Sequence, residues 1–266
     1  MYPEQTKQKG FSLIELMIAV LLSGVMAMAV SSIYVTGVQQ ADNNHQQAQL
    51  NHNLRASLDL MLAELKRAGS YVIDFTTISD QDDFSVYTAN PFMQGVNNLT
   101  LGGSCTGNIC TCVTYSYDLN RDSSIGVSTN PGATLADPAT ENTANVEQFG
   151  FCLNNGALEM RRSRAAIANT GFDCTSSTGR WEDLTDPEVT IDDFDVRYID
   201  ENGTTQAGPE QRDLTNSDTS CDPSVNCLEI RYLAISITGS LGDYSLSAAG
   251  RVRIRNDRLY TVPAAP

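Results

Sequence analysis

The stretch that decides the fold lies near the N-terminus, where residues 11–30 read FSLIELMIAVLLSGVMAMAV. Twenty residues of α-helix rise about 30 Å, which is the thickness of the hydrocarbon core of a bilayer. The run contains one charge, at Glu15, and it follows the polar leader MYPEQTKQKG. Basic residues before an apolar helix, here Lys7 and Lys9, favour a cytoplasmic start. We therefore expect a transmembrane segment over residues 11–33, followed by an exported head.

The residues alone leave three fates open for this N-terminus. An uncleaved anchor would keep Met1, whereas ordinary signal peptidase would use the small residues before Val30 and release the head. A third cut, between Gly10 and Phe11, lies ahead of the apolar run. It keeps the hydrophobic helix in the mature chain.

The composition is that of a folded globular protein, with 266 residues of which 41% are hydrophobic and 18% are charged. The 17 basic and 32 acidic side chains give a formal net charge of −15. Such a surface repels phosphate backbones, so we expect no general nucleic-acid binding. His45 and His52 are the only histidines, and the commonest general base is therefore missing after residue 52. We predict that the protein is not an enzyme.

The helix is expected to continue beyond the membrane. From residue 50 on, apolar side chains recur at steps of three and four and form one stripe, made by Leu50, Leu54, Leu58, Met61, Leu62 and Leu65. Gly69 follows Ala68 and suits a helix C-terminus. We predict one helix over residues 11–68, whose second half packs on a globular head.

After residue 69 the sequence changes to strand-like segments and polar loops. We predict strands over residues 84–88, 112–117, 146–153, 157–163, 189–199, 228–238 and 246–255, and long loops over 119–145 and 200–226. Asn155-Gly156 and Asn202-Gly203 are type I′ hairpin signals, and Gly242-Asp243 is expected to turn the last hairpin. The predicted fold class is α+β, with the helix packed on an antiparallel β-sheet head.

The stretch Gly10-Phe11-Ser12-Leu13-Ile14-Glu15 resembles the prepilin-peptidase site of type IV pilins and pseudopilins. Three later segments, LKRAG at 65–69, CVTYSYD at 112–118 and VRIRN at 252–256, resemble the PilW-type minor pilins. The resemblance implies a pilin-like fold, cleavage after Gly10, methylation of the new Phe11 amine and a role for Glu15 in filament assembly. It divides the chain into a leader peptide (1–10), a long helix (11–68) and a periplasmic head (69–266).

Independently of the resemblance, the cost of a charge in a membrane indicates that Glu15 needs a partner. A carboxylate at the centre of a transmembrane segment costs roughly 2.5–3.5 kcal/mol, so it needs a partner. After cleavage the Phe11 amine is a nearby cation, and a neighbouring subunit in a filament would present its own amine. At ~4 Å and an effective dielectric constant of 20, such a pair is worth about 4 kcal/mol before desolvation. We predict that Glu15 pairs with an amine during assembly.

Seven cysteines in the C-terminal two-thirds of the chain indicate an oxidising compartment and several disulfides: Cys105, Cys110, Cys112, Cys152, Cys174, Cys221 and Cys227. We predict the pairs Cys221–Cys227 and Cys152–Cys174. Cys105 would pair with Cys110 or Cys112, which leaves one thiol free or paired with another subunit. Structural zinc is the alternative, although the spacings contain no CxxC pair and no nearby histidine.

A candidate calcium loop lies at residues 118–122. Asp118, Asn120 and Asp122 place oxygen side chains at alternate positions, as at the start of an EF-hand loop. The later EF-hand positions hold Ser123 and Thr129 in place of glycine and glutamate, so this is not an EF-hand. An Asx-rich turn is the simpler interpretation, and we expect no cofactor other than calcium at this loop.

The resemblance implies a minor pilin that primes or enters a type IV pilus, as a single-pass inner-membrane protein with a periplasmic head. Its partners would be other minor pilins, the major pilin, prepilin peptidase and the pilus assembly machinery. Twitching motility, adhesion and DNA uptake are the processes that the family implies. Two alternatives remain, a minor pseudopilin of a type II secretion system and a membrane-anchored periplasmic binding protein.

Overall fold

The computed structural model describes residues 10, 12–73, 88–119, 121, 123, 125, 147–162, 174, 180–215 and 221–263. Helix α1 spans Leu13–Leu65, and two short 3₁₀ helices follow, η1 (Pro91–Met93) and η2 (Gly95–Asn97). The strands are β1 (Thr100–Thr106), β2 (Ile109–Ser116), β3 (Gln148–Asn154), β4 (Ala157–Arg162), β5 (Arg180–Asp183), β6 (Thr190–Ile199), β7 (Glu210–Asp213), β8 (Asn226–Ile230), β9 (Tyr232–Leu241), β10 (Tyr244–Arg253) and β11 (Arg258–Thr261). The chain divides into two units, residues 1–48 and 49–266, and the boundary lies within α1.

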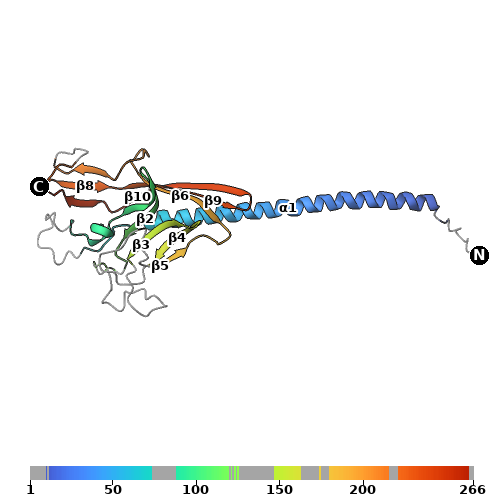
Figure 1. Cartoon of the computed structure of the whole chain (residues 1–266), viewed down its shortest axis with the longest axis horizontal. Coiled ribbons are helices and arrows are strands. Elements are labelled where there is room, and N and C mark those ends of the chain that lie inside the picture. Colours follow the sequence, from blue (N-terminus) through green and yellow to red (C-terminus); the bar gives the residue numbers. More distant parts are fainter. Residues whose placement is uncertain are drawn as a thin grey trace, which may run out of the picture. The chain divides into compact units, whose positions relative to one another are not determined.

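All pairings between these strands are antiparallel, and they form two sheets. The larger sheet has the order β10-β9-β6-β2-β3-β4-β5, and β1 also pairs with β2. The smaller sheet has the order β11-β8-β7. The predicted α+β class, a long N-terminal helix with an antiparallel β-sheet head, is confirmed (Figure 1).

The C-terminal part of α1 supplies one wall of the core. The predicted stripe is buried at Leu50, Leu54, Leu58, Met61 and Leu65, and Leu62 is partly buried. These side chains share one apolar cluster with alternate residues of the larger sheet, such as Val113, Tyr115 and Phe151. Figure 1 shows this part of α1, in cyan, beside the strands of the sheet.

Two glycines let the helix approach the sheet closely. A Cβ on Gly239 of β9 would lie 3.1 Å from Leu54 Cδ2, and one on Gly250 of β10 would lie 2.6 Å from Leu62 Cδ1. Both contacts are shorter than ordinary van der Waals separations. The absence of side chains at these positions therefore sets the distance between α1 and the edge of the sheet.

The helix ends as predicted near Gly69, four residues after the last α-helical residue. Gly69 has φ +72°, a conformation that costs other residues roughly 1 kcal/mol or more. Its N–H donates to the carbonyl oxygen of Ser116 at 2.7 Å. This hydrogen bond joins the end of α1 to the end of β2.

Two of the predicted hairpin turns connect adjacent strands. Asn155 and Gly156 have φ of 49° and 80°, as a type I′ turn requires, and they join β3 to β4. Gly242 and Asp243 join β9 to β10, where Leu241 pairs with Tyr244. Asn202-Gly203 also forms a turn, but it leads only to an isolated bridge between Ile199 and Thr205. The turn at Asn202-Gly203 therefore does not join two paired strands, as the hairpin prediction required.

Several strand predictions differ from the structure. The single strand expected over residues 228–238 is two strands, because β8 belongs to the smaller sheet and β9 to the larger one. The loop expected over 200–226 contains β7, and β1, β5 and β11 were not predicted. Residues 84–87 of the strand expected over 84–88 and most of the loop expected over 119–145 lie outside the described residues, and Thr88 is not in a strand.

Arg231 explains the break between β8 and β9. It lies between the two strands and its side chain is 1% exposed, with Nε 3.8 Å from the carboxylate of Glu229. Its guanidinium also donates to Asn98 Oδ1 at 2.9 Å and to the Asn256 carbonyl oxygen at 2.7 Å. Burial lowers the pKa of Arg231 and the Glu229 carboxylate opposes this shift. Arg231 therefore lies at the junction of the two sheets, and it shares Glu229 with Arg258 of β11, whose guanidinium lies 3.1 Å from the same carboxylate.

We predict that Arg231→Leu destabilises the head by about 1.5–3 kcal/mol, because Asn98 and Asn256 lose a charged donor, while Glu229 keeps its contact with Arg258 at 3.1 Å. Arg212→Leu is the matched control. Arg212 pairs with Glu210 at 2.8 Å but its side chain is 50% exposed, so we expect a much smaller loss of stability.

Both variants are measured by urea unfolding of the full chain in detergent, with fluorescence of Trp181, the single tryptophan of the sequence. Equal losses in the two variants would contradict the structural role of Arg231.

Candidate functional site

The start of α1 carries a capping box made by two residues of the predicted processing motif. The Ser12 N–H donates to Glu15 Oε2 at 3.1 Å, and the Ile14 N–H donates to Ser12 Oγ at 3.4 Å. A serine before the helix and a glutamate three residues later satisfy backbone donors that have no partner inside the helix. The carboxylate also lies at the positive end of the helix dipole.

This arrangement gives Glu15 a partner within its own chain. Sequence reasoning placed the carboxylate opposite an amine and missed Ser12, although the S-x-x-E spacing of residues 12–15 is the usual signal for a capping box. Gly10 is exposed, and Phe11 lies outside the described residues. Because Phe11 directly precedes Ser12, an amine created by cleavage after Gly10 lies one residue from the N–H that Glu15 binds.

The first part of α1 is suited to an apolar environment. Its large hydrophobic side chains from Leu13 to Val38 are exposed, and one window of α1 near the N-terminus is long and apolar enough to cross a membrane. Four hydroxyl groups in this stretch donate to carbonyl oxygens three or four residues earlier in the helix, namely those of Ser23, Ser31, Ser32 and Thr36. Their hydrogen-bonding needs are therefore met without water.

The two histidines lie on the surface of α1. His45 and His52 are both exposed, as expected for solvated helix residues. One open cavity of the described head is lined by residues of η1 and β11 and their neighbours: Thr88, Asn90, Met93, Gln94, Arg258, Leu259, Tyr260 and Thr261. This set contains no histidine, cysteine or carboxylate, so it offers no acid–base pair.

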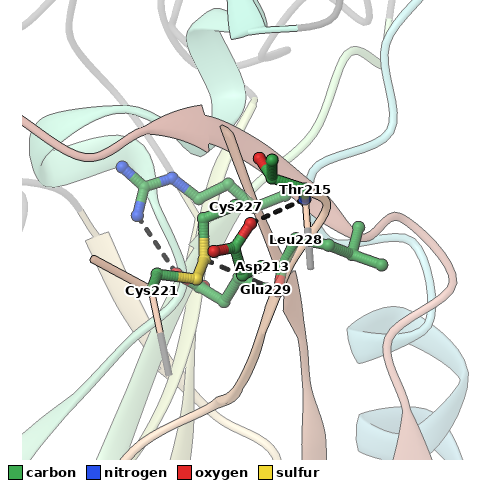
Figure 2. Close-up of a disulfide and its surroundings, with 7 residues drawn as sticks. Asp213, Thr215, Cys221, Cys227, Leu228 and Glu229 are labelled. Carbon is green, nitrogen blue, oxygen red and sulfur yellow. Dashed lines mark hydrogen bonds and ion pairs between the residues drawn. A yellow bond between two sulfur atoms is a disulfide. The ribbon is translucent and has the colours of Figure 1, made fainter. Parts of the chain in front are cut away.

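Two separate disulfides agree with predicted pairings. The hairpin disulfide, Cys105–Cys110, links β1 to β2, and the small-sheet disulfide, Cys221–Cys227, links β8 to the segment before it. Figure 2 shows the small-sheet disulfide beside Asp213, whose carboxylate accepts a hydrogen bond from the Thr215 N–H at 2.6 Å.

The other three cysteines lie together in one cluster. The predicted bond Cys152–Cys174 is not formed in the structure. Cys112 instead lies within bonding distance of both Cys152 and Cys174, and the three sulfur atoms all lie within 4.8 Å of one another. The prediction was wrong because sequence spacing does not show that β2 and β3 pair with Cys112 opposite Cys152.

The Asp118 carboxylate is engaged with backbone groups. It accepts hydrogen bonds from the N–H groups of Arg121, Val72 and Ser123 at 2.6, 3.2 and 3.1 Å. The contacts with Arg121 and Ser123 hold the loop locally, and the contact with Val72 joins it to the segment that follows α1. Asn120 and Asp122 lie outside the described residues, so the calcium site stays a prediction.

Electrostatic contacts also fix the end of the helix on β2. Tyr117 donates from its hydroxyl to Glu64 Oε2 at 2.8 Å, and the Arg67 guanidinium lies over its ring at 4.2 Å from the centroid. Burial and the hydrogen bond to Glu64 raise the pKa of Tyr117. The tyrosine therefore stays neutral at physiological pH and acts as a structural donor.

Comparison with known proteins gives one family match for the N-terminal segment and another for most of the rest of the chain. The family described as the prokaryotic N-terminal methylation motif matches residues 5–31, which include the capping box and the apolar run. The family described as prepilin peptidase-dependent protein B matches residues 43–255, well over half of the chain. No significant match was found among curated proteins or solved structures. The chain therefore belongs to the prepilin peptidase-dependent protein B family and is a pilin-type protein with an N-terminal methylation motif.

Proposed function

We propose that this protein is a minor pilin that is cut after Gly10, methylated at Phe11, and then primes or enters a type IV pilus. The observation that carries the proposal is the position of Glu15. It is the single charge of the apolar run, and it lies within hydrogen-bonding distance of the residue that follows Phe11. A carboxylate in an apolar helix is costly without a partner, and an amine created by cleavage after Gly10 would be a nearby one.

The assembly step is an exchange of partners at Glu15. Before assembly, the carboxylate caps its own helix through the Ser12 N–H. In a filament, apolar helices of neighbouring subunits replace lipid around residues 13–38. The amine of a neighbour then supplies a full positive charge, which attracts the carboxylate more strongly than a backbone dipole does.

The proposed location follows from the same features. An apolar segment with lysines before it favours the inner membrane with the head in the periplasm. The disulfides of the head favour an oxidising compartment. Other minor pilins, the major pilin, prepilin peptidase and the assembly machinery are the proposed partners, and the proposed role is structural rather than catalytic.

Processing is tested by mass spectrometry of the N-terminal peptide from protein expressed in its native membrane. We expect a chain that begins at methylated Phe11. A chain that begins at Val30 would identify a released periplasmic protein, and one that begins at Met1 would identify a simple anchored protein. Either result would overturn the assembly mechanism.

Two substitutions separate the capping role of Glu15 from its pairing role. Gln at the fourth position of a capping box still accepts the Ser12 N–H, but it carries no charge. We expect Glu15→Gln to keep the helix and the membrane insertion and to lower the amount of subunit in sheared filaments at least tenfold, the effect of losing about 1.4 kcal/mol.

The matched control is Ser12→Ala, which removes the side-chain half of the cap and keeps the charge. Its cost is about 0.5–2 kcal/mol of helix stability, and we expect incorporation to be retained. Normal incorporation of the Glu15→Gln protein would show that capping, and not ion pairing, is what Glu15 supplies.

Deletion of the gene distinguishes the pilus from the secretion pseudopilus, because the two share the leader and the apolar helix. We expect loss of surface pili with protein secretion intact. Loss of secretion with normal pili would instead identify a type II pseudopilin. Retention of both would favour an anchored binding protein.

A further inference from the structure

The cysteine cluster of the head contains an odd number of cysteines. The sequence has seven cysteines, and the hairpin and small-sheet disulfides use four of them. The remaining three are Cys112, Cys152 and Cys174, whose sulfur atoms all lie within 4.8 Å of one another. Because a sulfur atom forms only one disulfide, the cluster contains one disulfide and one thiol.

Both candidate partners are within reach of Cys112. Cys152 lies directly opposite on β3, with a Cα–Cα separation of 4.2 Å, and Cys174 lies 6.0 Å away. Bridges require backbone movement only beyond about 7 Å. All three sulfurs lie within 4.8 Å of one another, so an attacking sulfur needs little movement to reach the bond between the other two.

Strand β1 leaves space for this cluster. Gly102 pairs with Cys112 in the strand register, and a Cβ on Gly102 would lie 3.1 Å from Cys174 Sγ. A Cβ on Gly103 would lie 3.0 Å from Cys112 Cβ. Gly102 therefore makes room for Cys174 beside β2, where a side chain would crowd its sulfur, and Gly103 makes room for Thr111 and Cys112.

The three sulfurs differ in exposure. Cys112 is 1% exposed and Cys152 is 6% exposed, whereas Cys174 is only half-buried. Along β2 and β3, Cys112 and Cys152 alternate with Val113 and Phe151 of the core cluster, so they lie on the face of the sheet that points away from α1. Of the two residues that carry the thiol in the alternative linkages, Cys174 is therefore more exposed than Cys152.

We propose that Cys112, Cys152 and Cys174 form a disulfide-exchange site, with Cys174 as the thiol that reacts with disulfides of other molecules. The thiolate of Cys174 attacks Cys112 Sγ, the Cys112–Cys174 bond forms, and the Cys112–Cys152 bond breaks. Cys152 leaves as a thiolate and takes up the proton that Cys174 lost. The step needs no oxidant or reductant, and its reverse restores the first state.

The reaction with a second molecule follows from the state in which Cys174 is the thiol. Its thiolate attacks one sulfur of an external disulfide, a mixed disulfide forms, and the other half of that molecule leaves as a thiolate. The internal exchange thus controls modification of the head, because the buried Cys152 thiol does not react. This proposal does not depend on which filament the chain enters.

The first test maps the linkages of the full chain in detergent. The protein is quenched in acid, alkylated under denaturing conditions and digested without reduction. We expect one alkylated cysteine per chain, both linkages (Cys112–Cys152 and Cys112–Cys174), and the label on Cys174 or Cys152 accordingly. A single linkage would overturn the proposal, as would three thiols with one equivalent of zinc, which would identify a metal site.

The second test follows the native protein with glutathione disulfide as the probe. We expect glutathione to accumulate on Cys174 until every chain carries it, including chains that began with the Cys112–Cys174 bond. Labelling that stops at the initial fraction of Cys112–Cys152 chains would show a fixed mixture without exchange. The double variant Cys221→Ser/Cys227→Ser is the matched control, because it removes a separate disulfide and keeps the odd thiol.

Gly102→Ala tests the geometry. The added Cβ crowds Cys174 and leaves the bond between β2 and β3 untouched. We expect the share of the Cys112–Cys174 linkage to fall severalfold and the initial rate of glutathione labelling to rise. An unchanged share would show that β1 does not position Cys174.

Discussion

The folded head depends on one apolar contact, in which the stripe from Leu50 to Leu65 on α1 covers the larger sheet. Each fully buried leucine or methionine contributes about 1.5–3 kcal/mol, so five of them together are comparable with the net stability of a whole domain. Gly239 and Gly250 contribute to this contact, because the absence of a side chain at each position lets the stripe approach the strands. The same helix has no such cover from Leu13 to Val38, where its apolar side chains are exposed. One continuous helix therefore has two apolar surfaces, and the head of the same chain covers only the stripe from Leu50 to Leu65.

The parts of the fold that the sequence predicted are those with strong local signals. The leucine stripe gave the buried face of the helix, and Asn155-Gly156 gave its hairpin because both residues adopt positive φ. The parts that it did not predict depend on distant partners. Strand β1 contains Gly102 and Gly103, which local propensity disfavours in a strand. It forms because β2 pairs with it and because its glycines leave room for the sulfur cluster.

Arg231 shows the same limit in another form. From the sequence alone, an arginine within an apolar segment is interpreted as one exposed position of a continuous strand, because side chains alternate between the two faces of a strand. Its burial becomes understandable only when Glu229, Asn98 and Asn256 are seen around its guanidinium. A cation with such partners fixes where the chain passes from the smaller sheet to the larger one. The predicted cysteine pairs failed for the same reason at Cys152, because the register of β2 and β3 is a non-local property.

The capping box explains how a charged Glu15 can lie in an apolar segment before a neighbouring subunit is present. A carboxylate in an apolar segment is costly without a partner, yet a subunit has no neighbour until it assembles. The Ser12 N–H and the positive end of the helix supply a partner at once, so the lone subunit tolerates the charge in the membrane. In the proposed assembly, the cap is weaker than an ion pair with a neighbour's amine, and the difference between the two would favour association. Glu15 can therefore be stable before assembly and still favour it, provided that the terminal amine of a neighbour comes within hydrogen-bonding distance.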